Sequence, residues 1–296
     1  MRSNRTRNGI FGMILLAIFS AAGFNAHAQV PTASPSPTPK ASATPTLESQ
    51  FFKDILRDQK AIWTSPFHLQ GRDARWLAPL GLGTAALIAT DRRTGDEIAK
   101  FHNQLQASRA ISYIGSDYGV ASIVGTFYVV GRATHNTRAR ETGVLGAEAL
   151  VDSAIVVTAL KEISQRRRPR AAVGRGDFFR GGSSFPSGHS IEAWSLATVI
   201  ANEYHDHRLV QISAYGIAGA VSIARYTGRN HFLSDVFVGS AIGYGIGRYV
   251  YRAHHRKSSD SDDEEESRGR SRIWPLIVPQ YDRRAREYGV GLAWSF

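Results

Sequence analysis

Six apolar segments occupy the middle of this 296-residue chain and constrain its fold more than any other feature. They are rich in alanine, glycine, valine and isoleucine, and they lie at roughly 76–90, 111–131, 143–160, 189–204, 209–224 and 235–251. Segments of this length predict helices, so we expect an all-α fold with a six-helix core bundle. Between the first two segments, Thr94 and Glu97 have the spacing of a capping box, which predicts a further short helix.

A glycine repeat lies within the last apolar segment. Gly239, Gly243 and Gly247 recur every four residues, so they share one face of a helix. A face without side chains allows a neighbouring helix to approach closely, in water as well as in a bilayer. The repeat therefore predicts close helix packing and does not decide between the two environments.

The same segments leave membrane insertion open. Their uninterrupted apolar runs are only about 12–17 residues, below the ~20 of a membrane span, and Asp117, Glu148 and Asp152 interrupt them. Two arginine clusters argue the other way, because a six-span enzyme would carry cytoplasmic charges there. They are Arg132, Arg138 and Arg140, and Arg248, Arg252 and Arg256. The balance favours a periplasmic domain with membrane association, and an embedded bundle is the alternative.

The N-terminal residues resemble an export signal. Residues 1–28 combine Arg2, Arg5 and Arg7 with the apolar stretch 10–24 and the small-residue cleavage pattern at 26–28. An uncleaved anchor helix is the alternative reading. Residues 29–46 form a Pro/Ser/Thr-rich linker, which predicts an extended or disordered tether.

The remaining segments complete the predicted domain organisation. Apolar residues recur at helical period over 47–66, so we expect an amphipathic helix that packs on the core or lies on a bilayer. The helical domain is then 47–257. An acidic run at 258–267 lies within a charged flexible linker, 258–272, for which a calcium site is the alternative reading. Two short strands, 273–278 and 288–296, predict a C-terminal β-hairpin (273–296) packed on the helical domain.

Charge and cysteine content restrict the partners of the chain. The formal net charge is +11, and about +8 remains without the three arginines of the export signal. Such a balance suits lipid headgroups or phosphorylated substrates, and export argues against nucleic acid. The chain has no cysteine, so the fold depends on packing without disulfides. The sequence does not indicate an oligomeric state.

A basic stretch follows the third apolar segment. Lys161 lies near the end of that segment, and Arg168 precedes Pro169, where the chain must leave the helix. Lysine supplies a point charge and arginine a bidentate fork, a combination that suits a phosphoryl group. We assign Arg166 and Arg167 instead to a solvated helix end that complements the macrodipole.

The second stretch opens the fourth apolar segment. Pro186, Ser187, Gly188 and His189 come directly before the run, where helix starts are expected. A helix start also presents free amides to an anion, and glycine permits close approach. We therefore expect the Ser187 hydroxyl and the amides of 187–189 to line an oxyanion pocket, with 181–184 as a mobile loop over it.

The third stretch combines Arg225, His231 and Asp235. Residues four apart share a helix face, so His231 and Asp235 are expected together at the start of the sixth helix. A carboxylate that binds one ring nitrogen leaves the other free as a nucleophile. A capping aspartate beside a surface histidine is the structural alternative.

The order and spacing of these stretches resemble the Lys-x6-Arg-Pro, Pro-Ser-Gly-His and Arg-x5-His-x3-Asp signatures of the phosphatidic acid phosphatase type 2 / vanadium haloperoxidase superfamily. The resemblance covers roughly residues 80–250. It implies that His231 is a nucleophile oriented by Asp235, and that His189 is the general acid and base. It also implies phosphoryl binding by Lys161, Arg168, Ser187, Gly188 and Arg225, without metal or other cofactor. Ala224 departs from the family pattern, which usually has serine there.

These features predict a metal-independent phosphatase of the cell envelope that acts through a phosphohistidine on phosphate monoesters or on lipid phosphates. The lipid substrates expected are of the phosphatidic acid or polyprenyl diphosphate type. Two alternatives remain open. A vanadate-dependent haloperoxidase would use the same anion pocket, although the chain is short for one. A non-catalytic envelope protein that binds anions would explain the basic charge, the linker and the hairpin.

Overall fold

The computed structural model describes residues 47–99, 104–170, 176–269, 276–282 and 287–293. The predicted export signal and the linker at 29–46 lie outside the described residues. The chain forms two compact units, Met1–Tyr251 and Arg252–Phe296, which we describe separately.

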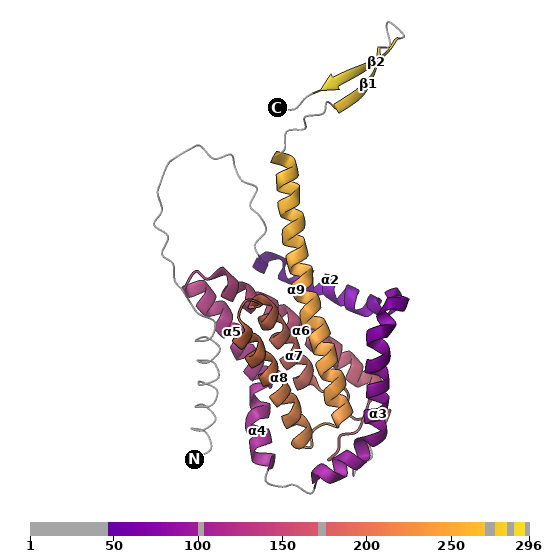
Figure 1. Cartoon of the computed structure of the whole chain (residues 1–296), viewed down its shortest axis with the longest axis vertical. Helices are drawn as coiled ribbons and strands as arrows, with labels where there is room; N and C mark the ends of the chain where they lie inside the picture. Colours follow the sequence, from indigo (N-terminus) through magenta and orange to yellow (C-terminus); the bar gives the residue numbers. More distant parts are fainter. Residues whose placement is uncertain (1–46, 100–103, 171–175, 270–275, 283–286, 294–296) are drawn as a thin grey trace. The chain divides into compact units, whose positions relative to one another are not determined.

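All secondary-structure elements in the described part of the first unit are helices, which confirms the all-α prediction (Figure 1). Its elements are α2 (Leu47–Thr64), η1 (Ser65–His68), η2 (Gly71–Asp73), α3 (Ala74–Ala99), α4 (Gln104–Ile114), α5 (Asp117–Ala133), α6 (Thr137–Ser164), α7 (Gly188–Glu203), α8 (Arg208–Thr227) and the first part of α9 (Leu233–Gly269). The predicted count of six core helices is not confirmed, because the described residues of one predicted helix, 111–131, belong to two helices, α4 and α5.

Two predicted boundaries in this unit are wrong. The segment 111–131 is divided between α4 and α5, and Ser116 caps α5 by accepting the amide of Gly119 at 3.2 Å. Thr94 does not start a new helix, because α3 continues to Ala99. Its hydroxyl donates instead to the carbonyl of Thr90 at 3.2 Å, as in a helix interior. The capping pattern of Thr94 and Glu97 therefore lies inside α3 and does not start a helix.

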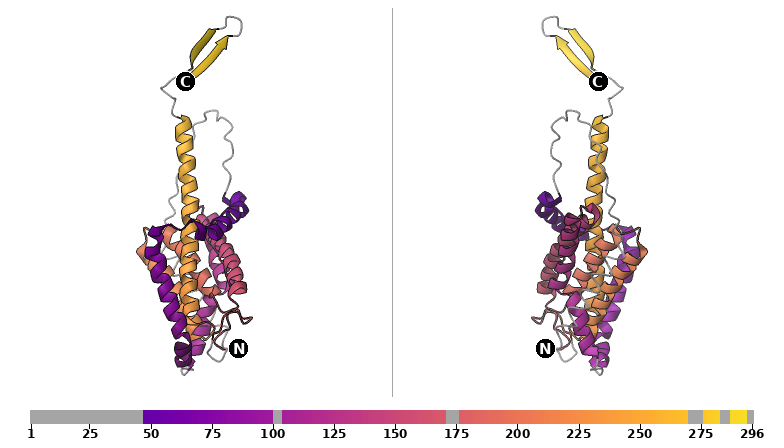
Figure 2. Two further views of the ribbon diagram at one scale, coloured as in Figure 1. Left: turned by 90° about the vertical axis from the view of Figure 1, so that its right-hand side faces the viewer. Right: turned by 90° about the vertical axis from the view of Figure 1, so that its left-hand side faces the viewer.

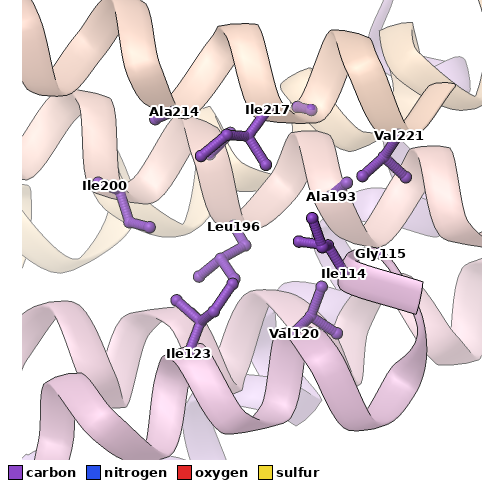
Figure 3. Close-up of a pocket in the computed structure, with 12 residues that line it drawn as sticks. Ile114, Gly115, Val120, Ile123, Ala193, Leu196, Ile200, Ala214, Ile217 and Val221 are labelled. Atoms are coloured by element: carbon purple, nitrogen blue, oxygen red, sulfur yellow. The ribbon is translucent and has the colours of Figure 1, made fainter. Parts of the chain in front are cut away.

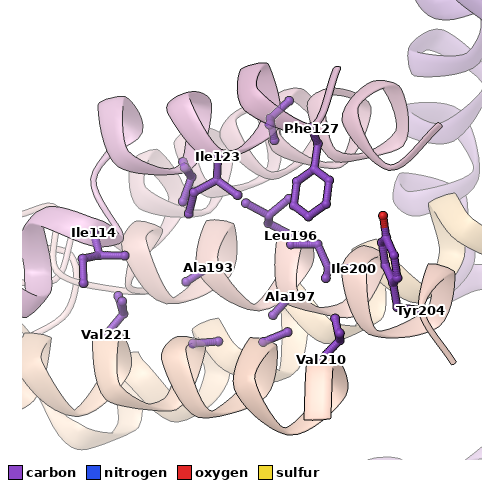
Figure 4. Packing of buried hydrophobic residues seen from close by; sticks show 14 of the residues in the cluster. Ile114, Ile123, Phe127, Ala193, Leu196, Ala197, Ile200, Tyr204, Val210 and Val221 are labelled. Atoms are coloured by element: carbon purple, nitrogen blue, oxygen red, sulfur yellow. The ribbon is translucent and has the colours of Figure 1, made fainter. Parts of the chain in front are cut away.

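The core lies where α5, α6, α7 and α8 pack against one another, an arrangement that both views in Figure 2 show. Phe127, Leu196 and Ile200 are almost fully buried in it (Figure 4). A second cluster joins α6 and α7 to α9 through Leu145, Ile191 and Val250. An apolar pocket of about 30 Å³ lies between α5, α7 and α8, with Ala193 and Val221 at its lining (Figure 3).

The helix predicted over 47–66 is α2, and it packs on α6. Ile55 and Asp58 are buried, whereas Phe52 and Leu56 are exposed at 78% and 72%. One face of α2 therefore packs on the core of the domain, as one of the two predicted alternatives stated. The other face leaves two large apolar side chains uncovered.

The glycine repeat of α9 lies against the backbone of α7, which confirms the predicted close packing. A Cβ atom on Gly239, Gly243 or Gly247 would lie 2.8, 2.2 or 2.3 Å from a carbonyl oxygen of α7. Those oxygens belong to residues of the first three turns, beginning at Ser187 just before the helix. The repeat thus aligns the start of α9 with the start of α7.

The second unit contains the rest of α9 and two strands. The acidic run 258–267 is helical, as part of α9, where the sequence predicted a flexible linker. Glutamate is a good helix former, and no glycine or proline interrupts the run before Gly269. Strands β1 (Leu276–Asp282) and β2 (Glu287–Ala293) pair antiparallel, with Leu276 opposite Ala293. Residues 273–275 of the first predicted strand lie outside the described residues, and packing of the hairpin on the helical domain stays a prediction.

Substitution of Gly243 by alanine should destabilise the protein, because the new methyl group would overlap the carbonyl of Ile191. We expect a loss of about 1–3 kcal/mol in the free energy of unfolding, measured by denaturant titration. Gly245 is the matched control on the same helix, since a Cβ there would meet no atom within 4 Å. Gly245→Ala should be neutral or stabilising by up to about 1 kcal/mol. Equal effects of the two changes would contradict this packing.

Candidate active site

The three basic and histidine-containing stretches meet at neighbouring helix ends. The amide of Ser187, before α7, donates to the carbonyl of Asp235 on α9 at 3.0 Å. A Cβ on Gly188 would lie 3.4 Å from Lys161 Nζ, at the end of α6. After α8, the amide of His231 donates to the carbonyl of Arg225 at 3.3 Å. The structure therefore brings one residue or more of every predicted motif to one place.

His231 is buried, and a backbone carbonyl fixes its ring. Its Nδ1 lies 2.7 Å from the carbonyl oxygen of Ser184 and 3.6 Å from Asp235 Oδ2. A carbonyl can only accept, so Nδ1 carries the hydrogen and Nε2 keeps a free lone pair. The prediction that the Asp235 carboxylate binds the ring directly is corrected, because 3.6 Å is too long for a hydrogen bond.

Asp235 supports His231 through the backbone. Its Oδ2 accepts from the Ser184 hydroxyl at 2.5 Å and from the Phe232 amide at 2.9 Å, which caps α9. His231 itself precedes α9, which begins at Leu233, so it does not lie in the helix as predicted. Asp235 therefore caps α9, as the structural alternative stated, and it also contacts Ser184.

Burial and charge set the protonation of this pair. Burial lowers the pKa of His231, and the charges of Arg225 and Arg168 add to this against the opposing effect of Asp235. For Asp235, burial acts to raise the pKa, but the contact with His231 and the charge of Arg166 outweigh it, and the pKa is lowered. We therefore expect a neutral imidazole above an ionised carboxylate near neutral pH.

Arg166 is the largest correction to the sequence-based assignment. It was assigned to a solvated helix end, yet it is 1% exposed. Its guanidinium donates to Asp235 Oδ1 at 2.5 Å and to Asp91 Oδ2 at 2.8 Å, and it lies over the rings of Phe178 and Phe232 at 4.6 and 4.4 Å. Further bonds go to the Ser234 hydroxyl and the Gly176 carbonyl.

The direction of the chain after α6 explains why Arg166 turns inward. Gln165 ends the helix in the left-handed conformation, with φ of 43°. The next residue therefore leaves the helical path, and its neighbour Arg167 is exposed, as predicted. This turn decides which of the three adjacent arginines, 166–168, is buried. No signal in the sequence distinguishes them.

Asp91 is a functional candidate that sequence reasoning missed. It lies on α3, is 2% exposed, and accepts from the Ser234 amide at 3.1 Å and from the Ser234 hydroxyl. Together with the Arg166 contact, these bonds join α3 to the start of α9. The only signal in the sequence was an aspartate directly after an apolar segment, and nothing tied it to Arg166.

The loop before α7 is anchored by backbone hydrogen bonds, and its predicted mobility stays a prediction. The amide of Ser184 donates to the carbonyl of Arg166 at 2.8 Å, and that of Gly182 to the carbonyl of Gln165 at 2.9 Å. A Cβ on Gly182 would lie 2.1 Å from the Arg166 carbonyl, so the position requires glycine. Ser184 is fully buried and contacts both His231 and Asp235.

The cations predicted to bind phosphate, Lys161, Arg168 and Arg225, lie close enough to repel one another. Burial lowers the pKa of Arg225 to about 10, and the charges of Arg168 and Arg170 add to this. Burial, with the charges of Arg225 and His231, lowers the pKa of His189 to about 3. The Nε atom of Arg225 is buried and has no hydrogen-bond partner among the described residues. Such a group is stabilised by an anion.

The start of α7 supplies the amides for that anion, with one correction. The first amides of a helix have no partner within it, which leaves those of Gly188 and His189 available. The amide of Ser187 is not available, because it donates to Asp235. Ala224, the departure from the family pattern, is buried within α8 directly before Arg225.

Comparison with known proteins agrees with this geometry. The family model of the PAP2 superfamily matches residues 143–259, which include all three motifs. Residues 143–259 are therefore similar to the PAP2 superfamily. A curated relative, the lipid A 1-phosphatase of Porphyromonas gingivalis, is 33% identical over 70 residues. These residues are 23% of this chain, and the chain covers 16% of that relative's length.

A solved structure shows a similar fold. A phosphatidylglycerolphosphate phosphatase from Bacillus subtilis, described as transmembrane and of PAP2 type, superposes with a TM-score of 0.50 at 22% identity. The likeness covers 60% of this chain and 96% of that one. LpxE of Aquifex aeolicus superposes with a TM-score of 0.42 at 23% identity over 51% of this chain and 88% of its own. The helical unit therefore shares its fold with the Bacillus subtilis phosphatase.

Replacement of Arg166 by methionine should both destabilise the protein and reduce activity, because Asp91 and Asp235 would be left as buried, unpaired carboxylates. Breaking a buried pair from one side typically costs about 3–5 kcal/mol in the free energy of unfolding. Arg167→Met is the matched control, since Arg167 is exposed, and should change stability by less than about 0.5 kcal/mol. Similar losses for both variants would contradict the assignment.

Proposed function

We propose that the protein is a metal-independent phosphatase that acts through a phosphohistidine at His231. The observation that carries the proposal is the buried His231 ring, whose Nδ1 donates to the Ser184 carbonyl beside a group of unneutralised cations. This arrangement leaves Nε2 as a nucleophile next to an anion site. The similarity of residues 143–259 to the PAP2 superfamily supports the same reaction class.

The reaction proceeds in two steps. Nε2 of His231 attacks phosphorus while the bond to the ester oxygen breaks, and His189 gives a proton to the leaving alkoxide. In the second step His189 accepts a proton from water, whose oxygen attacks phosphorus and releases His231. Lys161, Arg168 and Arg225, with Ser187 and the amide of Gly188, stabilise the phosphoryl oxygens. These cations supply the charge that a metal provides in other phosphatases.

His189 has a low pKa in the free protein, so its proton as general acid depends on the substrate. Burial lowers that pKa, and the charges of Arg225 and Lys161, between which the phosphoryl dianion would lie, add to this effect. When the anion neutralises them, the pKa of His189 rises towards the range of a general acid. Substrate binding thereby prepares the acid for the first step.

We further propose that the substrate is a lipid phosphate and that the helical unit associates with a membrane. Large apolar side chains are exposed on several helices, and such a surface indicates contact with lipid or protein. They include Phe52, Leu56, Trp76, Leu82, Tyr118, Val129, Leu209, Ile212 and Ile223. Among the described residues, α6 is the one helix long and apolar enough to cross a bilayer, and 56% of its most apolar window is buried. Buried core helices have the same composition, so α6 does not decide between association and insertion.

The first test compares wild type with His231→Ala on a panel of esters. Phosphatidic acid and polyprenyl diphosphate represent lipid substrates, and nucleotides represent soluble ones. We expect hydrolysis of the lipids, a loss of more than about 10³-fold in His231→Ala, and no loss with EDTA at temperatures well below unfolding. Near wild-type turnover by His231→Ala, or abolition by EDTA, would overturn the proposal. Release of the protein by sodium carbonate would distinguish peripheral from embedded protein.

The same panel separates the other functions. Vanadate-dependent oxidation of halide without ester hydrolysis would identify a haloperoxidase. Phosphate binding without turnover of any ester would leave an anion-binding protein.

His189→Ala should affect esters according to their leaving groups. An alkoxide needs a proton from His189, and we expect a loss of about 10²–10⁴-fold on alkyl phosphates. An aryl oxide such as p-nitrophenolate leaves without a proton, so the first step should survive and labelled phosphoenzyme should accumulate. Labelling with ³²P, quenched in alkaline detergent because phosphohistidine is labile in acid, measures this intermediate. Equal losses on both kinds of ester would remove His189 as the general acid.

The pH dependence of kcat/KM should show the lowered pKa of His231. The nucleophile must be unprotonated, so activity is lost as the pH falls through its pKa. Since burial lowers that pKa, the acid limb should lie below 6.5. Phosphate monoesters also titrate near pH 6, so two esters with different phosphoryl pKa values should be compared. A limb that moves with the ester belongs to the substrate, and a shared limb above 6.5 would contradict the prediction.

A further inference from the structure

A buried group of three carboxylates lies between α2 and α6, outside the active site. Asp58 is on α2, and Glu148 and Asp152 are one turn apart on α6. One oxygen from each lies within 4.8 Å of the others, and the three residues are 0–4% exposed. At 1.5 Å per residue, Asp152 is roughly 14 Å along α6 from Lys161, so this acidic cluster is separate from the phosphate site.

The positive charge around the acidic cluster is insufficient. Its ion pairs in the described part of the chain involve Arg57, which contacts Asp58 Oδ1 at 2.9 Å and approaches Glu148 Oε1 at 4.0 Å. The same guanidinium also contacts Asp54 at 2.8 Å. Gln59 donates to Asp152 Oδ1 at 2.8 Å, but an amide brings no net charge. One cation therefore faces four carboxyl groups.

Two oxygens of the acidic cluster accept no hydrogen bond of ordinary geometry from the described residues. Asp58 Oδ2 and Asp152 Oδ2 are buried and have no hydrogen-bond partner among the described residues. Buried carboxylate oxygens are normally paired, hydrogen-bonded or bound to metal. Because Arg57 and Gln59 occupy the other oxygen of each group, the unpartnered atoms are the ones left to face a ligand.

We propose that the acidic cluster is a site for a hard divalent cation, of the class of Ca²⁺, Mg²⁺ and Mn²⁺. All of its donors are carboxylate oxygens, which these ions prefer, and it offers no imidazole or thiolate for zinc or copper. A bound cation would supply the missing positive charge and the missing partners of both Oδ2 atoms. It would also fasten α2, which precedes the matched PAP2 segment, to α6 within that segment.

Protons are the competing occupants of the acidic cluster. Burial and the neighbouring carboxyl groups raise the pKa of Glu148 to about 9, so a single shared proton relieves part of the repulsion. One proton cannot satisfy two separate Oδ2 atoms, whereas a cation with several oxygen ligands can. The experiment must therefore distinguish a bound ion from protonated carboxyls.

The test uses the full purified chain, with bound metal measured by emission spectroscopy before and after dialysis against EDTA. Thermal unfolding is then followed in EDTA and in millimolar CaCl₂, MgCl₂ or MnCl₂. We expect about one ion per chain and a rise of at least about 3 °C in Tm with one of the three salts. Absence of bound ion together with a Tm that none of the salts changes would overturn the site in favour of protonated carboxyls.

Matched variants locate the ion. Glu148→Gln and Asp152→Asn should abolish the rise in Tm, and either one suffices if the other fails to fold. The variant D262N/D263N removes charge from the acidic run at 258–267, and it should keep the full rise. His231→Ala should also keep it, which separates this site from the phosphate site. A rise that survives both cluster variants, or that disappears in D262N/D263N, would overturn the assignment.

Discussion

Arg166 donates to Asp91 on α3 and to Asp235 on α9 from a fully buried position between two phenylalanine rings. Two carboxylates and one guanidinium leave a net negative charge in this network, and hydrogen bonds from Ser184, Phe232 and Ser234 offset its burial. Breaking any partner would leave a buried charge unpaired, so the network fixes several helix ends at once. The position of His231 depends on this constraint.

The active-site arrangement follows from that fixed framework. The amide of Ser184 donates to the carbonyl of Arg166, which positions Ser184. The carbonyl of Ser184 in turn accepts from Nδ1 of His231 and selects the tautomer of that ring. The glycine repeat of α9 brings the same helix start against α7, where Ser187 bonds to Asp235. The proposed nucleophile, His231, and the amides proposed to bind the anion are therefore positioned by contacts among the same few backbone groups.

The helical unit contains two buried groups of like charge, one of cations near His231 and one of carboxyl groups between α2 and α6. Near His231, buried cations lower one another's proton affinity, and a phosphoryl dianion would relieve them. Between α2 and α6, buried carboxyl groups outnumber the one arginine beside them, and a cation would relieve those. Buried charges of one sign cost stability without a ligand, and this cost supports the proposal that each arrangement binds an ion of the opposite sign.

Short-range signals in the sequence were sufficient for the helices, the glycine repeat and the residues of the three motifs, because each depends on spacing along one element. The inward turn of Arg166, its pairing with Asp91 and the anchoring of Ser184 were not predictable. They depend on the left-handed Gln165 and on contacts between residues as many as 75 positions apart. The sequence by itself therefore determined which side chains are available for phosphate chemistry. Only the tertiary structure decided that Ser184, and not Asp235, accepts the hydrogen of His231, because that choice depends on distances between separate helix ends.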